Sequence, residues 1–291
     1  AMGTRLMDQG VSIGSGLDSA NLDAPGVVQA VHRDYVAAGA DILQTNTFGA
    51  NHFRLSKHGL SAKVRRINRQ GAMLAKGVAN PEHFVAGSMG PVGKPIAPIG
   101  KIAETEAFEA FKEQAEALLE ADVDLIILET FTDLHETRLA LKAVLSIAPD
   151  MPVIGMMTFT DEGKTIYGFK PEECARELMS DGAVAIGANC SSGPAHLHEV
   201  VDRMNRVDDV IIFVSPNAGL PAFIDGRYVY LTGPDYFAKQ AKQFVAQGVR
   251  GFGGCCGTGP EHISAIQAAI GNEKPVFGED RVSTDVSIEF Q

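Results

Sequence analysis

The sequence contains no tryptophan and only four cysteines among its 291 residues, and aromatic side chains make up 7% of it. No apolar run approaches the roughly 20 residues that a membrane-spanning helix needs, and no secretory signal peptide opens the chain. Cysteines this few, without the spacing of a disulfide framework, are typical of a reducing compartment. We therefore expect a cytoplasmic protein without a membrane partner.

Basic residues are also scarce. The chain has 25 lysines and arginines against 36 acidic residues, which gives a formal net charge of −11. An acidic surface repels phosphate backbones, so this balance argues against a nucleic-acid partner. Hydrophobic residues make up 45% of the chain, which is enough to bury a large core. The 31 glycines fit an α/β protein with many tight turns between strands and helices.

Short apolar runs alternate with longer amphipathic segments along the chain. The runs are continuous in apolar character, which favours strands that are covered on both faces. A helix is predicted over Thr105–Leu119 from its apolar spacing. Regular alternation of strand and helix implies a parallel sheet, either doubly wound or closed into a barrel. The predicted strands are Asp41–Thr45, Phe84–Ser88, Asp124–Thr130, Val153–Phe159, Ala183–Cys190, Val210–Ser215 and Val249–Cys256.

These are seven strands, whereas a (β/α)₈ barrel needs eight. The chain opens with a sequence that reads like the turn after a strand, so we expect a first strand truncated at the N-terminus. The alternating pattern stops near residue 271, which predicts one barrel domain over 1–272 and a tail or linker over 273–291. Thr232 and Thr258 each precede an acid by three residues, with a proline between, which predicts a capping box at two helix starts.

Three cysteines fall at predicted strand ends, namely Cys190 and the adjacent pair Cys255 and Cys256. The carboxyl ends of the strands form the functional rim of a parallel barrel. With the missing strand counted first, these are strands 6 and 8, which brings three thiols within reach of one point. Three thiolates suit Zn²⁺ and leave a fourth position open. From spacing alone, inert buried cysteines remain an alternative, and a strained vicinal disulfide is a weaker one.

For three other residues that could in principle bind a metal, we predict a role unrelated to metal binding. Cys174 lies in a helix-like segment and is predicted to be a small core residue. His196 and His198 have a metal-like spacing, but they lie at the start of an outer helix, so we predict solvated histidines.

Six motifs occur in one order along the chain and together resemble the homocysteine S-methyltransferase, or homocysteine-binding, domain. They are most similar to the module of cobalamin-dependent methionine synthases and of bifunctional homocysteine S-methyltransferase/methylenetetrahydrofolate reductases. The motifs are AMGT (1–4), QTNTFGAN (44–51), LETFTDL (128–134), GANCSSGP (187–194), PNAGLP (216–221) and GGCCGT (253–258).

This resemblance implies a TIM barrel, with a zinc ion held by Cys190, Cys255 and Cys256. It implies an enzyme that transfers a methyl group to the thiol of homocysteine and so produces methionine. It assigns Asn217 as a fourth zinc ligand in the substrate-free form, where the alternative is a turn residue. It assigns Glu129 to the substrate ammonium, where the alternatives are a helix cap or a structural ion pair. The family also begins with a strand ending in Asp-Gly just before AMGT, and that aspartate helps to seat the amino acid.

Two further strand ends carry hydroxyl groups. Thr45 and Ser88 are candidates for holding the substrate carboxylate together with backbone N–H groups, and turn-stabilising hydroxyls are the alternative.

The methyl donor is external to this domain. Methylcobalamin on another module, S-methylmethionine and a donor from a folate module all suit the resemblance, whereas the lack of tryptophan argues mildly against a cage for a quaternary ammonium. Three alternative functions remain: a non-catalytic zinc-binding barrel, a redox-sensing barrel, and methylation of a different thiol or selenol.

Overall fold

One sheet of parallel strands organises the chain. The computed structural model describes residues 1–224, 227–271 and 288–289. Each strand of the sheet pairs with its neighbour in parallel, and most connections carry a helix, which is the pattern that buried apolar runs separated by amphipathic segments predict. The strands, in spatial order, are β1 (Ile42–Gln44), β2 (Phe84–Met89), β3 (Leu125–Phe131), β4 (Val153–Met157), β5 (Ala185–Cys190), β6 (Ile212–Pro216), β9 (Gly251–Phe252) and β10 (Ile288–Glu289).

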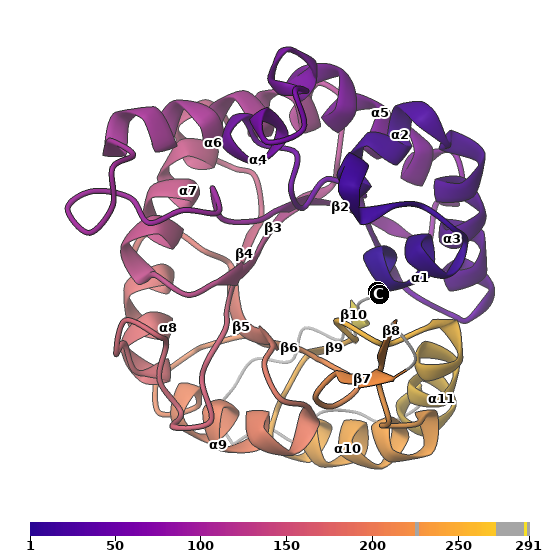
Figure 1. Ribbon diagram of the computed structural model, residues 1–291. Helices are drawn as coiled ribbons and strands as arrows, with labels where there is room; N and C mark the ends of the chain where they lie inside the picture. The colour runs from indigo at the N-terminus through magenta and orange to yellow at the C-terminus, as the bar shows by residue number, and fades with distance from the viewer. Residues whose placement is uncertain (225–226, 272–287, 290–291) are drawn as a thin grey trace.

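Helices surround this sheet as an outer ring (Figure 1). They are α1 (Met2–Asp8), α2 (Ala20–Asp23), α3 (Pro25–Ala37), α4 (His52–Ser56), α5 (Val64–Lys76), α6 (Glu104–Leu119), α7 (Leu134–Ile147), α8 (Pro171–Ser180), α9 (Pro194–Met204), α10 (Pro234–Ala246) and α11 (Pro260–Ile270). Short 3₁₀ turns are η1 (Ile13–Ser15), η2 (Leu17–Ser19) and η3 (Ser61–Lys63), and an antiparallel hairpin, β7 (Ala222–Ile224) with β8 (Arg227–Val229), interrupts the connection from β6 to α10.

The curled parallel sheet with its ring of helices confirms the predicted (β/α)₈ barrel class. β10 extends the sheet beyond β9, with Ile288 opposite Gly251, on the side where the sequence left room for one more strand. Within the part of the chain that the structure describes, no ladder joins β10 to β1. Most of the predicted tail, 272–287 and 290–291, lies outside the described residues, so the domain boundary at 272 stays a prediction.

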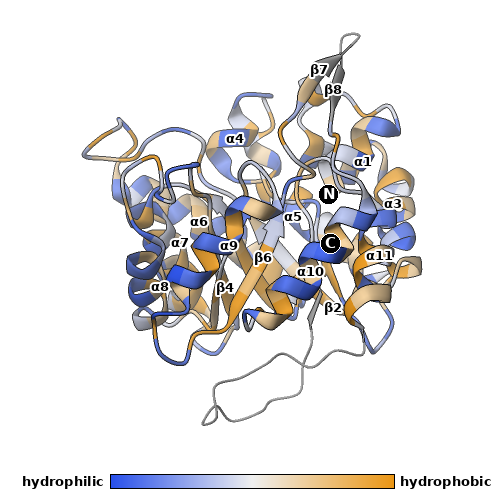
Figure 2. Cartoon of the chain, turned by 90° about the horizontal axis from the view of Figure 1, so that it is seen from below, coloured by the Kyte–Doolittle hydropathy of each residue, from blue (hydrophilic) through white to orange (hydrophobic). Residues whose placement is uncertain are grey.

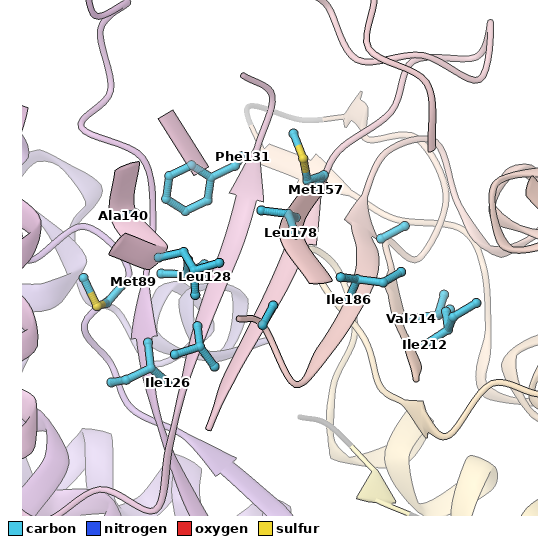
Figure 3. Packing of buried hydrophobic residues seen from close by; sticks show 14 of the residues in the cluster. Met89, Ile126, Leu128, Phe131, Ala140, Met157, Leu178, Ile186, Ile212 and Val214 are labelled. Carbon is cyan, nitrogen blue, oxygen red and sulfur yellow. The ribbon is translucent and has the colours of Figure 1, made fainter. Parts of the chain in front are cut away.

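The core has two layers, because side chains on a strand alternate between the two faces of the sheet. The outer layer packs strands against helices and includes Met89, Leu128 and Leu178 (Figure 3). The inner layer fills the barrel with Ile42, Ala86, Leu125, Ile127, Ile154, Met156, Ala185 and Phe213. Counting onward by two from this inner layer places Ser88 and Glu129 on the interior face, one step nearer the carboxyl ends of the strands. A polar layer therefore lies directly on an apolar floor.

The outer surface of the molecule is more hydrophilic than this core. Hydrophilic residues cover the outward faces of helices such as α8 and α10, while strands β4 and β6 are hydrophobic (Figure 2). None of the helices in the described ranges is both long enough and apolar enough to cross a membrane.

Three local predictions differ from the structure. The last strand was predicted over Val249–Cys256, but β9 spans only Gly251–Phe252, because the glycine-rich segment after it leaves the sheet as a turn. Neither predicted capping box forms. The helices begin one residue later than the threonines require, with N-caps Gly233 and Gly259. Thr258 instead donates its hydroxyl to the carbonyl of Cys255 at 2.7 Å.

The prediction of solvated histidines on α9 is also wrong. His198 is half-buried, and its ring stacks on that of Phe244 with 3.9 Å between centroids. Its ring nitrogens lie 2.5 and 2.6 Å from the side-chain oxygens of Gln247 and Gln240 on α10 and beside it. His198 is therefore a packing residue between helices. Cys174, by contrast, is buried in α8 as predicted.

Candidate functional site

Three cysteine thiols meet at the carboxyl edge of the sheet. Cys190 ends β5, and Cys255 and Cys256 follow β9. Their Sγ atoms all lie within 4.8 Å of one another, with 3.9 Å between the two neighbours. All three are free thiols and half-buried. The structure therefore brings the predicted ligands together, and their role in holding a metal is a proposal developed below.

The end of β6 aligns the two cysteine segments through backbone hydrogen bonds. Cys255 donates its N–H to the carbonyl of Pro216 at 2.8 Å, and Ala218 donates to the carbonyl of Cys256 at 2.9 Å. On the other side of β6, Cys190 pairs with Pro216 in the ladder. Because β6 lies between β5 and β9, the sheet itself aligns the two chain segments that carry the thiols.

Two residues at the cysteine cluster adopt left-handed backbone conformations, which end the regular alternation of side chains along the strands. Cys190 has a φ of +66°, a left-handed conformation that non-glycine residues rarely adopt. Gly257, directly after the cysteine pair, has a φ of +82°, and a Cβ atom there would lie 2.1 Å from Cγ of Tyr230. Only glycine satisfies both conditions, so Gly257 is required for the turn.

The ionisation of each of the three thiols depends on the other two. Hydrogen bonds from Cys255 and then Cys256 lower the pKa of Cys190 below its ordinary value. The contact with Cys190 is the main reason why the pKa of Cys255 is raised, and it also raises the pKa of Cys256. One negative charge is therefore accommodated readily among the three sulfurs, and further ionisation requires a compensating cation.

Asn217 lies beside this cluster, just after β6. Its Nδ2 donates to the carbonyl of Ser191 at 2.6 Å and lies 3.5 Å from Sγ of Cys190. Its Oδ1 is buried and has no hydrogen-bond partner among the described residues. A buried oxygen without a partner costs free energy, so this atom is an open acceptor next to the thiols.

A carboxyl group lies on the interior face of the neighbouring strands. Glu129, near the end of β3, accepts a hydrogen bond from the hydroxyl of Ser88 on β2. Burial raises the pKa of Glu129 to about 7. Within the described residues no ion pair involves Glu129, so the structural ion pair considered as an alternative for it is not observed there.

The two predicted hydroxyl residues already make hydrogen bonds within the protein. Ser88 bonds to Glu129, as described. Thr45 accepts the backbone N–H of Ser88 at 3.0 Å, and its Oγ1 lies 2.6 Å from Oγ1 of Thr47. These contacts join β1, β2 and β3 below the site, and a role in holding the substrate carboxylate stays a prediction.

A cavity of about 490 Å³ connects the thiols with the carboxyl group. This volume lies within the range of small-molecule sites. Its far end reaches Ile13 on η1, Arg54 on α4 and His58. Asn217 is not among its lining residues, which places that amide behind the sulfurs. The predicted residues that line the cavity are Thr45, Ser88, Glu129, Cys190, Cys255 and Cys256.

Three residues at the site were missed by the sequence analysis. Asn189 and Thr130 hydrogen-bond to each other between β5 and β3, and Tyr230 lines the cavity beside Cys256. Burial, followed by the charge of Cys256, raises the pKa of Tyr230 to about 12. Asn189 lies within the GANC motif, but no spacing rule indicates a partner 59 residues away.

The comparisons with known proteins agree with this geometry. The chain matches the homocysteine S-methyltransferase family over residues 1–270. It belongs to that family. Its curated relatives include the methionine synthase of Mycobacterium leprae, which is 32% identical over 287 residues, covering 93% of this chain and 24% of that protein. The methionine synthase of Mycobacterium tuberculosis is 31% identical over 305 residues, covering 98% of this chain and 26% of that protein. The chain thus spans about a quarter of the length of these relatives.

A solved structure of the same family has a similar length to this chain. The metallated form of the homocysteine methyltransferase MmuM from Escherichia coli matches with a TM-score of 0.74 and 26% sequence identity, covering 92% of this chain and 93% of that one. The similarity therefore extends through the whole barrel of this homocysteine S-methyltransferase family member.

Proposed function

We propose that this chain transfers a methyl group to the sulfur of homocysteine and so produces methionine, with zinc held by Cys190, Cys255 and Cys256. The observation that carries the proposal is the convergence of three free thiols at the mouth of a barrel of this family. A buried carboxyl group across the same cavity supports an amino-acid substrate.

The residues present fit a zinc ion. Thiolates are preferred zinc ligands, and three of them leave one position of a tetrahedron for a substrate. The buried Oδ1 of Asn217, which lacks a partner among the described residues, is suited to that fourth position while substrate is absent. A neutral oxygen binds zinc more weakly than a thiolate does, so an incoming thiol would displace it.

Bound there, zinc would supply the positive charge that keeps a thiol deprotonated at neutral pH, and the thiolate is the nucleophilic form. The sulfur of homocysteine loses its proton to solvent. A new S–CH₃ bond forms while the bond between the methyl group and its donor breaks, and the electrons of that bond leave with the donor. Cys190, Cys255 and Cys256 would hold the ion that binds the reacting sulfur.

Glu129 is suited to the ammonium group of homocysteine. A carboxylate that is buried without a cationic partner among the described residues gains a charge-assisted hydrogen bond when an ammonium arrives. Ser88 and Thr45 hold Glu129 and the strand ends in register. Both line the cavity and are candidates for holding the substrate carboxylate, and that role is part of the proposal.

The donor has to enter through the open mouth of the barrel. Methylcobalamin on a further module and S-methylmethionine both carry a transferable methyl group, and the methionine synthases that this chain resembles are about four times its length. Large apolar side chains are exposed on loops around the mouth, among them Ile13, Leu220 and Leu231. The donor and the cytoplasmic location stay predictions, the latter from the cysteine content.

The direct test measures zinc and homocysteine together. Purified protein should contain about one zinc per chain, and adding homocysteine should release about one proton per zinc. Methionine should then form with S-methylmethionine or methylcobalamin as donor. Release of the proton should depend on bound zinc and be lost after chelation.

The same experiment separates the alternative functions. Zinc-replete protein that releases no proton with homocysteine would favour a non-catalytic or redox-sensing barrel. Proton release with another thiol or a selenol but not with homocysteine would change the substrate and leave the metal site intact.

A further inference from the structure

Asn189 makes contacts that the proposed reaction does not yet use. It is buried on β5, one residue before Cys190. Its Oδ1 accepts the backbone N–H of Thr130 at 2.8 Å, and its Nδ2 donates to Oγ1 of the same threonine at 2.7 Å. Its Nδ2 also lies 3.9 Å from Sγ of Cys255, at the outer limit of an N–H···S contact. One side-chain amide therefore contacts both sides of the cavity.

Thr130 needs such support because its backbone is strained. Its φ is +61°, a conformation that is unfavourable for a β-branched residue. The pairing of β3 with β4 shifts register between Leu128 and Phe131, so Thr130 lies in a bulge. Bulges re-aim neighbouring side chains and are frequent beside active sites.

The cavity residue next to this bulge is Glu129. It immediately precedes Thr130, lies within the same register shift, and lines the same cavity. If the two hydrogen bonds from Asn189 were lost, Thr130 would relax toward an ordinary strand conformation. Regular alternation from Ile127 already places Glu129 on the interior face, so relaxation at Thr130 would not turn it to the other face, but the shift of the adjoining peptide would change the depth of its carboxyl group in the cavity.

We propose that Asn189 is a positioning residue for homocysteine. It fixes the bulge at Thr130 so that the carboxylate of Glu129 meets the substrate ammonium at the distance set by the cysteine cluster. This inference rests on the proposed function, in which Glu129 binds the ammonium and the cysteines hold zinc. If Asn189 had only a structural role, it would connect β3 and β5. Its loss would then lower the stability of the barrel but leave the preference for a substrate with an amino group unchanged.

The test uses the preference for homocysteine over 4-mercaptobutyrate, which has the same thiol and carboxylate but lacks the amino group. Dissociation constants for both are measured on the zinc-loaded protein by calorimetry. Asn189→Ala should lower the preference at least ~10-fold, since outer-shell contacts typically contribute 10–100-fold. Binding of 4-mercaptobutyrate should change by less than ~3-fold. Equal weakening of both ligands would overturn the proposal.

A conservative substitution at Asn189 should restore the preference for homocysteine. Asn189→Asp keeps an acceptor for the N–H of Thr130 and a partner for its hydroxyl, so it should restore most of the preference. A loss of preference as large as that of the alanine variant would contradict the proposal. Asn205→Ala is the matched control, because the side-chain amide of Asn205 also bonds to the backbone, donating to the carbonyl of Gln247 at 2.8 Å, but Asn205 follows α9 and does not line the cavity.

Two further outcomes are informative. If Asn189→Ala does not fold, Thr130→Val removes only the hydrogen bond to Oγ1, and it should reduce the preference several-fold, whereas an unchanged preference overturns the proposal. If the wild-type protein binds neither thiol, the proposed function fails first, which distinguishes that failure from a failure of the role of Asn189.

Discussion

The two sides of the cavity are assembled in different ways. On the sulfur side, two distant chain segments are aligned by backbone hydrogen bonds to β6. On the carboxyl side, side-chain hydroxyls join the ends of neighbouring strands, since Thr45 after β1 accepts the N–H of Ser88 on β2, and the hydroxyl of Ser88 donates to Glu129 on β3. The sulfur side consists of Cys190, Cys255 and Cys256, and the carboxyl side consists of Thr45, Ser88 and Glu129.

The difference shows what each side still lacks. The thiols crowd together, so that only one is readily ionised, and they need a cation to become three thiolates. The carboxyl group is desolvated, which raises its pKa to about 7 even though the hydrogen bond from Ser88 acts in the opposite direction. Under the proposed function, a metal would complete the first side and the ammonium of the substrate would complete the second. A substitution on one side of the cavity should therefore impair that side without impairing the structure of the other.

The largest effect is expected on the sulfur side. Cys255→Ser should lower both zinc affinity and methionine formation by at least ~100-fold, because a hydroxyl is a far poorer zinc ligand than a thiolate. Zinc is measured by metal analysis after competition with a chelator. Cys174→Ala, which removes a buried thiol from α8, is the control and should keep both properties. A Cys255→Ser protein with full zinc and activity would refute the site assignment.

A smaller and more selective effect is expected on the carboxyl side. Glu129→Gln removes the charge that meets the ammonium, and a hydrogen bond to a charged group contributes roughly 1.5–3 kcal/mol. The dissociation constant of homocysteine should therefore rise by ~10- to 100-fold, while zinc content stays at one per chain. Loss of zinc in this variant would show that the two sides are not independent.

A second buried glutamate, which lies outside the cavity, provides a comparison with Glu129. Glu136, on α7, accepts the N–H of Val92 at 2.8 Å, and burial raises its pKa to about 7 as well. It does not line the cavity. Since its pKa is higher in the folded state than the ordinary value of 4.5, its contribution to stability is full below about pH 4.5 and is lost as the pH rises through 7.

Glu136→Gln should therefore flatten the pH dependence of stability. Relative to wild type, the variant should gain up to ~3 kcal/mol between pH 5 and pH 8, as measured by urea unfolding at the two values. Its affinity for homocysteine should not change. A parallel loss of homocysteine binding would mean that burial of a carboxyl group anywhere in this barrel, rather than its place in the cavity, governs affinity.

Much of the fold could be predicted because it depends on local pattern. The helix predicted over Thr105–Leu119 is observed over Glu104–Leu119, and the apolar runs up to Ser215 all contain strands. The last strand was overestimated because Gly253 and Gly254 lack side chains, so apolar pattern cannot mark where the sheet ends. The capping threonines were misplaced because the helix start depends on which residue adopts the N-cap conformation, and in both cases a glycine does.

The site was predictable only where the residue type itself reveals chemistry. Three cysteines at strand ends make a metal site a candidate from spacing alone, and the resemblance of the surrounding motifs to a known family favoured it over inert thiols. Asn189 could not be found in this way, because its role depends on a contact with Thr130 across β4 and on a backbone conformation that no spacing encodes. The hydroxyl of Ser88 was noticed, but its bond to Glu129 depends on the register of two strands.

The distance along the chain between Cys190 and Cys255 has a consequence for folding. A zinc ion held by both residues would close a loop of about 65 residues, and so act as a cross-link on the unfolded chain in the way that a disulfide does. For a loop of this length the entropic stabilisation is about 4 kcal/mol in the chain-entropy description. A reducing compartment would not break such a cross-link, whereas zinc starvation would, so metal supply would set the lifetime of the protein as well as its activity.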